Sequence, residues 1–295
     1  MDPTLSGISL RDAGTALLDL AMPRRCIACG RSLGLRERFL CLPCMADFPF
    51  THHWELSHNP MADKFNARLQ EDLDALAGSD PPHEPYAFAV ALFFYNSASD
   101  YRRIPWHLKY EGGLAAGRHF ARMLGERLAA SPQFADVDAV VPVPLHWTRQ
   151  WRRGYNQAEV IARELADVLG AEFRMDILRR SRRTRTQVRL PMAAKAANVR
   201  GAFSLRPSAL CPSSRSALSP RSSDRSRLSF SAFASRLFPA RCASSCNSQR
   251  VRHVLLVDDT FTTGSTLNAC RAVLRQAFPL PVRISVATLA YVNSD

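Results

Sequence analysis

The sequence predicts an α/β fold, a parallel sheet flanked by helices, preceded by a small segment with four cysteines. Three observations predict it. Short apolar runs rich in β-branched residues alternate with helical patterns, as expected for buried parallel strands joined by helices. Two Cys-x-x-Cys pairs stand near the N-terminus. Near the C-terminus, a strand runs into an acidic pair and a loop of small hydroxyl residues, which is a pattern of ligand sites at strand ends.

These patterns predict the elements in chain order. Apolar runs predict strands at 86–95, 137–143 and 254–257. Helical periodicity predicts helices over about 114–129, 157–169 and 267–278. Leu10, Ala13, Leu17, Leu18 and Ala21 predict a further short amphipathic helix that packs against the next segment of the chain.

Length and composition narrow the class of protein. The 295 residues, 46% of them hydrophobic, suffice for one or two domains with a sizeable core. The sequence contains no apolar stretch of about 18 residues, so we expect no transmembrane segment. It also shows no basic region followed by an apolar run and a cleavage site, so we expect no signal peptide and a cytoplasmic protein. The oligomeric state has no signature in the sequence.

The cysteine pairs predict a structural zinc site. Cys26 and Cys29 form one pair, Cys41 and Cys44 the other, and eleven residues separate them. Two such knuckles can close on one tetrahedral Zn²⁺, and four thiolates make a closed site with no open position for catalysis. Disulfides and a thioredoxin-type redox pair are the weaker alternatives, because we expect a reducing cytosol and neither pair lies in a βαβ pattern.

Residues 254–266 carry the chemistry of the chain. Strand residues 254–257 end in Asp258 and Asp259, whose carboxylates suit the hydroxyl groups of a ribose. The next loop contains Thr262, Thr263, Gly264, Ser265 and Thr266 and leads into a helix. Backbone N–H groups at a helix N-terminus favour an anion, and the loop hydroxyls add donors, so a phosphate fits there. Because no lysine follows Gly264, the loop is not the P-loop of a nucleoside triphosphatase.

These thirteen residues resemble the phosphoribosyl pyrophosphate (PRPP) motif of type I phosphoribosyltransferases. Further segments narrow the resemblance to the ComF/GntX-type family of that fold. The segments are Lys109-Tyr110 before Gly112, Val141-Pro142-Val143-Pro144, Arg153-Gly154-Tyr155-Asn156-Gln157, and the spaced set Arg180, Arg182, Thr184, Gln187, Leu190, Asn198 and Gly201-Ala202-Phe203. The family also carries an N-terminal cysteine-rich zinc segment. One departure is Lys195, which stands where the family pattern has an arginine and lacks its planar fork.

The resemblance implies a type I phosphoribosyltransferase-like sheet that binds PRPP with Mg²⁺. It places the ligand on Asp258, Asp259 and the loop 262–266. Basic and polar residues that would contact the pyrophosphate, or belong to a flexible hood closing over it, are Lys109, Arg152, Arg153, Arg182 and Gln187. Arg149, Arg152 and Arg153 are equally compatible with a solvated basic face. No residue is assigned as catalytic.

Composition divides the chain into three parts. Residues 1–58 hold the N-terminal helix and the zinc segment, and 86–295 form the phosphoribosyltransferase-like domain. Between them, 59–85 form a polar, proline-containing linker with a candidate helix from Phe65 to Leu76. An insert at 206–250 interrupts that domain: 14 of its 45 residues are Ser and 8 are Arg, with Asp224 its only acid. It carries +7 of the formal net charge of +13 and lacks periodicity, so we expect it to be disordered. A reading-frame error in the deduced sequence is the alternative.

Two classes of function remain open. In the first, the chain is an enzyme that transfers phosphoribosyl from PRPP to a nitrogen nucleophile and releases pyrophosphate; the acceptor is not readable from the sequence. In the second, it is a non-catalytic accessory protein of competence and DNA uptake, as the ComF resemblance implies. Its partners would then be single-stranded DNA or a helicase-like ATPase. Trp147 and Trp151, close to the arginines, suit base stacking or packing beneath a helix.

Overall fold

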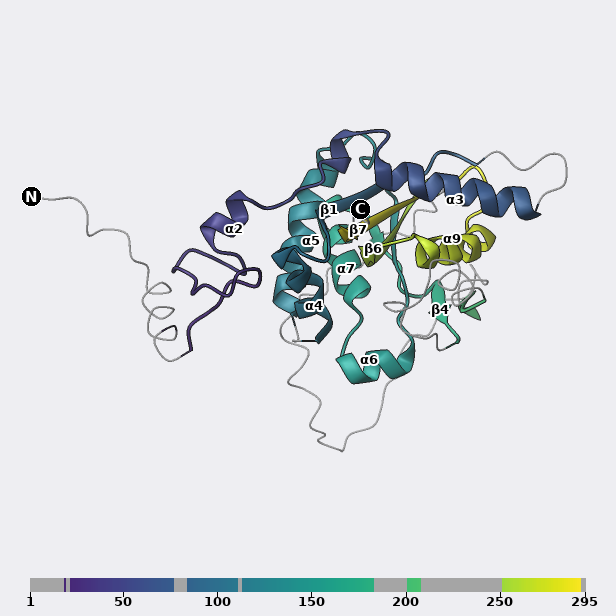
Figure 1. Cartoon of the computed structure of the whole chain (residues 1–295). Coiled ribbons are helices and arrows are strands. Elements are labelled where there is room, and N and C mark those ends of the chain that lie inside the picture. The colour runs from purple at the N-terminus through teal and green to yellow at the C-terminus, as the bar shows by residue number, and fades with distance from the viewer. Residues whose placement is uncertain are drawn as a thin grey trace, which may run out of the picture. The chain divides into compact units, whose positions relative to one another are not determined.

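The computed structural model describes residues 19, 22–76, 84–110, 113–182, 201–207 and 251–292. Five parallel strands form the main sheet in the order β1-β7-β6-β2-β3, and β4 and β5 form a separate antiparallel pair. Figure 1 shows β1, β7 and β6 of this sheet side by side. The predicted parallel α/β sheet is therefore confirmed. The strands are β1 (Ala89–Tyr95), β2 (Ala139–Pro142), β3 (Glu172–Phe173), β4 (Leu178–Arg180), β5 (Phe203–Leu205), β6 (His253–Phe261) and β7 (Arg283–Val292).

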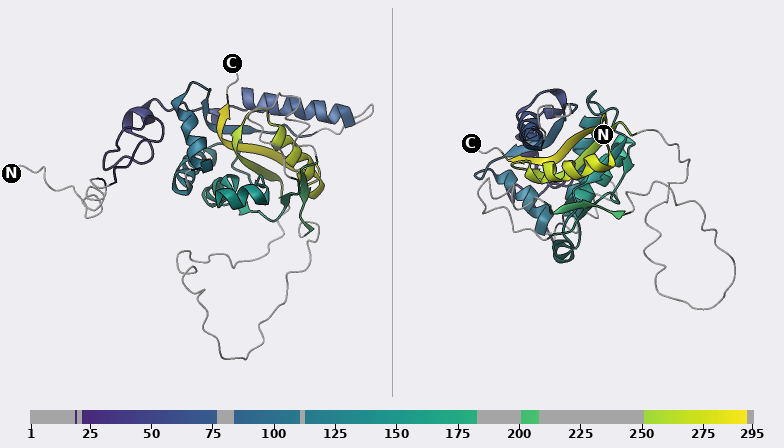
Figure 2. Two further views of the ribbon diagram at one scale, coloured as in Figure 1. Left: turned by 60° about the horizontal axis from the view of Figure 1, so that its bottom comes forward. Right: turned by 90° about the vertical axis from the view of Figure 1, so that its right-hand side faces the viewer.

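Helices cover both faces of this sheet (Figures 1 and 2). The α-helices are α2 (Leu42–Ala46), α3 (Pro60–Leu76), α4 (Arg103–Tyr110), α5 (Leu114–Ala129), α6 (Trp147–Arg153), α7 (Gln157–Leu169) and α9 (Ser265–Ala277), with short 3₁₀ turns η1 (His53–Glu55) and η2 (Asp100–Arg102). None of the helices in the described part of the chain is long and apolar enough to cross a bilayer.

The alternation of side chains along β6 shows how the core is divided. Leu255 and Val257 belong to a cluster with apolar residues of α5 and α7, whereas Val254 and Leu256 belong to a cluster with residues of α3 and α9. All four side chains are fully buried. A strand covered on both faces must be apolar at every position, which is why this run lacks the alternation of a half-exposed strand.

Strand β6 is longer than the sequence predicted. The apolar run ends at Val257, but backbone pairing with β7 continues through Asp258, Thr260 and Phe261. The acidic pair therefore lies within the last part of a strand, not in the loop after it. The loop after the strand is short, and α9 begins at Ser265, two residues before the predicted start.

Helix α3 occupies much of the region that the sequence placed in a linker at 59–85. The Asn59 side chain accepts hydrogen bonds from the backbone of Met61 and Ala62 and donates one to the carbonyl of Ala89. Pro60 stands at the first helical position, where its missing N–H costs nothing. Met61, Ala62 and Phe65 are fully buried against the sheet, which explains why this polar-looking segment is helical.

Three predictions fall outside the described residues. They are the N-terminal helix with Leu10 to Ala21, the region of Gln187 and Lys195, and nearly all of the insert at 206–250. The structure leaves each of them as a prediction.

Candidate functional site

A cleft of about 290 Å³ opens at the carboxyl ends of β1, β2 and β6. Parallel sheets of this kind bind ligands at that end. The residues that line the cleft are Tyr95, Lys109, Tyr110, Val143, Pro144, Leu145, Arg149, Arg153, Asn156, Gln157, Ala158, Arg180 and all of Asp258 to Leu267. The acidic pair and the hydroxyl loop predicted as the ligand site are thus together in one cavity.

The hydroxyl loop is folded as an anion site would require. Gly264 adopts φ +72° at the residue before α9, a left-handed conformation that favours glycine. Thr263 and Ser265 are buried, and their hydroxyls lie 2.8 Å apart. The first N–H groups of a 13-residue helix have no partners within the helix, and its dipole places positive potential at this end.

The two carboxylates differ in their surroundings. Asp258 accepts a 2.8 Å hydrogen bond from the backbone N–H of Asp259. Asp259 forms an ion pair with Lys109, whose Nζ lies 2.9 Å from Oδ2. Burial and the charge of Asp259 raise the pKa of Asp258 to about 7. Burial by itself would lower the pKa of the Lys109 ammonium group, but the nearby charge of Asp259, together with its hydrogen bond, outweighs that effect and raises the pKa. The ammonium group of Lys109 thus offsets the negative charge of Asp259 within this pair.

The predicted basic contacts separate into three groups. Lys109 and Arg153 line the cleft; Arg153 donates to Gln157 Oε1 at 3.1 Å and its guanidinium lies 5.4 Å from the ring centre of Tyr110. Arg152 and Arg182 are exposed and are not among the lining residues. Gln187 lies outside the described residues.

Two arginines outside the five pyrophosphate and hood candidates also line the cleft. Arg149 comes from α6, directly after β2. Arg180 comes from β4, with its guanidinium 5.0 Å from the ring centre of Phe203; burial lowers its pKa, and Asp258 acts in the opposite direction. Arg149 stood beside the chosen residues in the same basic run. Arg180 belongs to the spaced set that resembles the ComF/GntX-type pattern, but the sequence alone did not assign it to the cleft, because only the fold brings β4 beside it.

The wall beside Lys109 is braced by hydrogen bonds to the carbonyl of Leu108. Gln157 Nε2 donates to it at 3.2 Å, and the hydroxyl of Tyr155 donates to it as well. Asn156, which precedes α7, donates to the carbonyl of Val143 at 3.1 Å. The motif from Arg153 to Gln157 therefore connects the ends of α4 and β2 on either side of the cavity.

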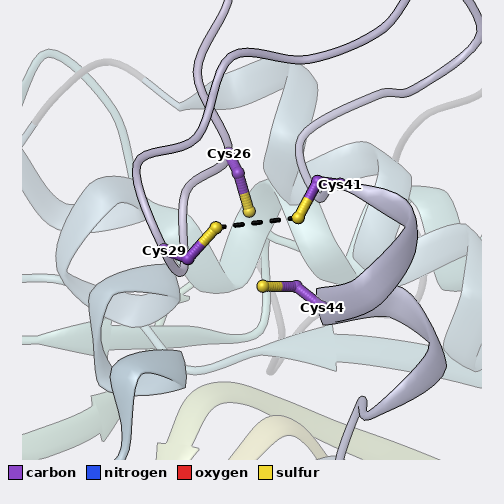
Figure 3. A group of neighbouring side chains, drawn as sticks. All are labelled: Cys26, Cys29, Cys41 and Cys44. Carbon is purple, nitrogen blue, oxygen red and sulfur yellow. Dashed lines mark hydrogen bonds between the residues drawn. The ribbon is translucent and has the colours of Figure 1, made fainter.

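The four predicted zinc ligands meet at a second place. The sulfur atoms of Cys26, Cys29, Cys41 and Cys44 all lie within 4.8 Å of one another, and those of Cys29 and Cys41 are 3.6 Å apart (Figure 3). Tetrahedral zinc–thiolate geometry, with bonds of about 2.3 Å, places sulfurs just under 4 Å apart. Gly30, at φ +77°, allows the first knuckle to turn, and its N–H donates to the carbonyl of Cys26. The donor set and its spacing fit structural Zn²⁺.

The cysteine segment is joined to the sheet domain by hydrogen bonds. Arg103 of α4 donates to the carbonyl of Ala28 at 2.9 Å, and the hydroxyl of Tyr101 donates to the carbonyl of Cys44 at 2.9 Å. Cys26 and Cys41 are themselves part of the buried cluster that continues under α5. The cysteine knuckles therefore contact η2 and the start of α4, the helix that carries Lys109 near its end.

Comparison with known proteins gives two kinds of relative. The chain is 27% identical over 260 residues to competence protein F of Haemophilus influenzae. The aligned region covers 85% of this chain and 91% of that protein. It is 38% identical over 68 residues to DNA utilization protein YhgH of Salmonella typhi, and 35% identical over 68 residues to that of Escherichia coli K12. These shorter matches cover 23% of this chain and 30% of each relative. No protein-family model matches the chain.

Proposed function

We propose that this ComF-like chain, which resembles competence protein F over 85% of its length, acts in DNA uptake and that its cleft binds PRPP or a related phosphoribosyl ligand. One observation supports this ligand above all: the acidic pair of β6 and the hydroxyl loop at the start of α9 line a single cavity with three arginines. Carboxylates can accept hydrogen bonds from ribose hydroxyls, a helix N-terminus can bind a 5′-phosphate, and arginines can bind a pyrophosphate.

Each part of the ligand has its own contact in this proposal. The 5′-phosphate accepts hydrogen bonds from the N–H groups and hydroxyls of Thr262 to Thr266. The 2′- and 3′-hydroxyls of the ribose donate to Asp258 and Asp259. The pyrophosphate lies toward Arg149, Arg153 and Lys109, on the side of the cleft formed by α4 and α6. Mg²⁺ would enter with the phosphates and spread their charge, since oxygen ligands are those it prefers.

A transferase reaction would need little from the protein beyond position and charge. A nitrogen nucleophile forms a bond to ribose C1 while the C1–oxygen bond breaks and pyrophosphate departs with the electron pair. The sugar is cationic in the transition state, so a carboxylate near it and cations near the pyrophosphate lower the barrier. The acceptor is not assigned.

Calorimetric titration of PRPP with Mg²⁺ tests this ligand. We expect the unaltered protein to bind and the double variant Asp258→Asn with Asp259→Asn to lose binding by a hundredfold or more, because two charge-assisted hydrogen bonds are weakened. Asp167→Asn is the matched control, since Asp167 is exposed on α7, away from the cleft. Equal affinity in the double variant and the control would contradict the proposed contacts. If PRPP binds, release of pyrophosphate with a panel of nitrogen bases then tests transfer.

A second candidate function, contact with single-stranded DNA, rests on the surface of α6. Trp147 and Trp151 are 72% and 86% exposed, so they do not pack beneath the helix. Four residues apart on one helix, they lie on the same side, and Arg149, Arg152 and Arg153 stand between and beside them. Exposed aromatic rings beside arginines are suited to stacking bases and contacting phosphates without sequence preference. The helicase-like ATPase stays a predicted partner.

Fluorescence anisotropy with a labelled oligothymidine tests the DNA contact. Binding should weaken steeply as salt rises, and Trp147→Ala with Trp151→Ala should weaken it by roughly tenfold or more, since each stacked base contributes about 1–3 kcal/mol. Met175→Ala serves as a control at another exposed apolar side chain. An affinity that neither salt nor the tryptophan substitutions change would remove α6 from this role.

A further inference from the structure

The ion pair between Lys109 and Asp259 stands where a ligand's ribose would bind. Within the cleft, Oδ2 of Asp259 is held 2.9 Å from the ammonium group, and both side chains are largely shielded from water, with exposures of 26% for Lys109 and 14% for Asp259. A ribose hydroxyl that donates to Asp259 must therefore share that carboxylate with Lys109 or displace it.

Displacing Lys109 has a cost that depends on the ligand. A partly buried ammonium group that loses its partner is strongly disfavoured unless another anion takes the partner's place. Ribose 5-phosphate carries its only anionic group at the position bound by the loop 262–266 and offers nothing to Lys109. PRPP carries a second anionic group at C1, which can accept the hydrogen bonds that Asp259 gives up.

Accordingly, we propose that Lys109 is a specificity-determining residue that exchanges partners, from Asp259 in the free cleft to the anionic C1 group of the ligand. The inference rests on the proposed phosphoribosyl site and goes beyond it. The exchange makes the cleft select sugar phosphates that carry a negative group at C1, and reject those from which that group has left. After pyrophosphate departs, the return of Lys109 to Asp259 competes with the remaining ribose hydroxyls and favours release.

The fold supports such an exchange. Lys109 lies in the last turn of α4, and the carbonyl of the preceding residue, Leu108, is fixed by Gln157 and Tyr155. The backbone at this point is thus anchored, while the four-carbon side chain of lysine can turn between two anions. Tyr95, at the end of β1, lines the same cavity.

The test compares two ligands in variants of one residue. PRPP and ribose 5-phosphate are titrated calorimetrically into the unaltered protein, Lys109→Met, Lys109→Arg and the control Lys64→Met, all with Mg²⁺. Lys64 lies on α3 and does not line the cleft. In Lys109→Met we expect PRPP affinity to fall about tenfold or more and ribose 5-phosphate affinity to rise severalfold, because Asp259 becomes free for the hydroxyls. Lys109→Arg should keep the preference for PRPP.

Opposite changes for the two ligands are the decisive result, since damage to the fold would weaken both. Urea denaturation of each variant checks that the domain remains folded. If both affinities fall together in a folded Lys109→Met protein, the exchange is refuted while the phosphoribosyl site stands. If neither ligand binds any of the proteins, the proposed function itself fails, and the exchange fails with it.

Discussion

Substituting Gly264 by alanine should separate two costs that the structure locates in the hydroxyl loop. An L-residue held near φ +72° is disfavoured by about 1–2 kcal/mol relative to glycine. In addition, the new Cβ would lie 3.0 Å from Cζ and 3.1 Å from Cε2 of Phe261. Phe261 is 1% exposed and packed within the core beneath the loop, and overpacking of this kind costs about 1–3 kcal/mol. We expect Gly264→Ala to lower the free energy of unfolding by about 2–5 kcal/mol.

Gly170→Ala is the matched control. Gly170 adopts φ +67° after α7, and an added Cβ there would meet no atom within 4 Å. The free energy of unfolding of Gly170→Ala should therefore fall only by the cost of the left-handed backbone conformation, about 1–2 kcal/mol. Urea denaturation of both variants gives the difference, which measures the contact with Phe261. Equal losses in the two variants would refute the contribution of Phe261. The same proteins should differ in PRPP titration, because only the change at Gly264 displaces the loop proposed to bind phosphate.

Other parts of the structure support three further predictions. Elemental analysis should find one Zn²⁺ per chain, and Cys26→Ser with Cys41→Ser should abolish it and destabilise the protein; a metal-free native protein that is fully folded would contradict the site. Burial lowers the pKa of His53 to about 4, below the value near 6.5 expected in the unfolded chain. The unfolded chain therefore takes up a proton first as the pH falls, and the free energy of unfolding should drop by up to about 3 kcal/mol between pH 6.5 and pH 4. The loss measured by urea denaturation should be smaller in His53→Leu, and an identical pH profile in that variant would show that His53 is not its source. Glu84 pairs with Arg271 and Arg275 of α9, and both arginines would lose a buried charged partner in Glu84→Gln, so we expect the free energy of unfolding to fall by about 3–5 kcal/mol. Glu172→Gln, at an exposed pair with Arg174, is the control and should lower it by less than about 1 kcal/mol. Similarly small losses in both variants would contradict the role of Glu84.

The parts of the fold that the sequence predicted well are those whose signal is local. The run from Val254 to Thr266 contains strand, acidic pair, loop and helix start in continuous order, so its pattern alone located the cleft. The four cysteines were equally readable, because two knuckles need only short spacings. Helix α5, at Leu114–Ala129, has the bounds that its periodicity predicted.

The features that the sequence did not predict depend on contacts between distant segments. The ion pair of Lys109 with Asp259 joins residues 150 positions apart. Arg180 reaches the cleft only because two very short strands, too short for periodicity, place it there. Helix α3 was predicted only in part, from Phe65 to Leu76, because its polar composition and flanking prolines resemble a linker, while its stability comes from Phe65 and its neighbours against the sheet.

The position of β7 has a consequence for how the chain folds during synthesis. Strand β1 pairs with β7 alone among the strands of the main sheet, and partners such as Ala89 and Val286 are 197 residues apart. The seven apolar residues of β1 emerge from the ribosome early but have no strand to pair with until the last described strand has been made. Such late, long-range pairing is slow and leaves a hydrophobic strand open to wrong association. The nascent chain should therefore depend on chaperones until translation of β7 is finished.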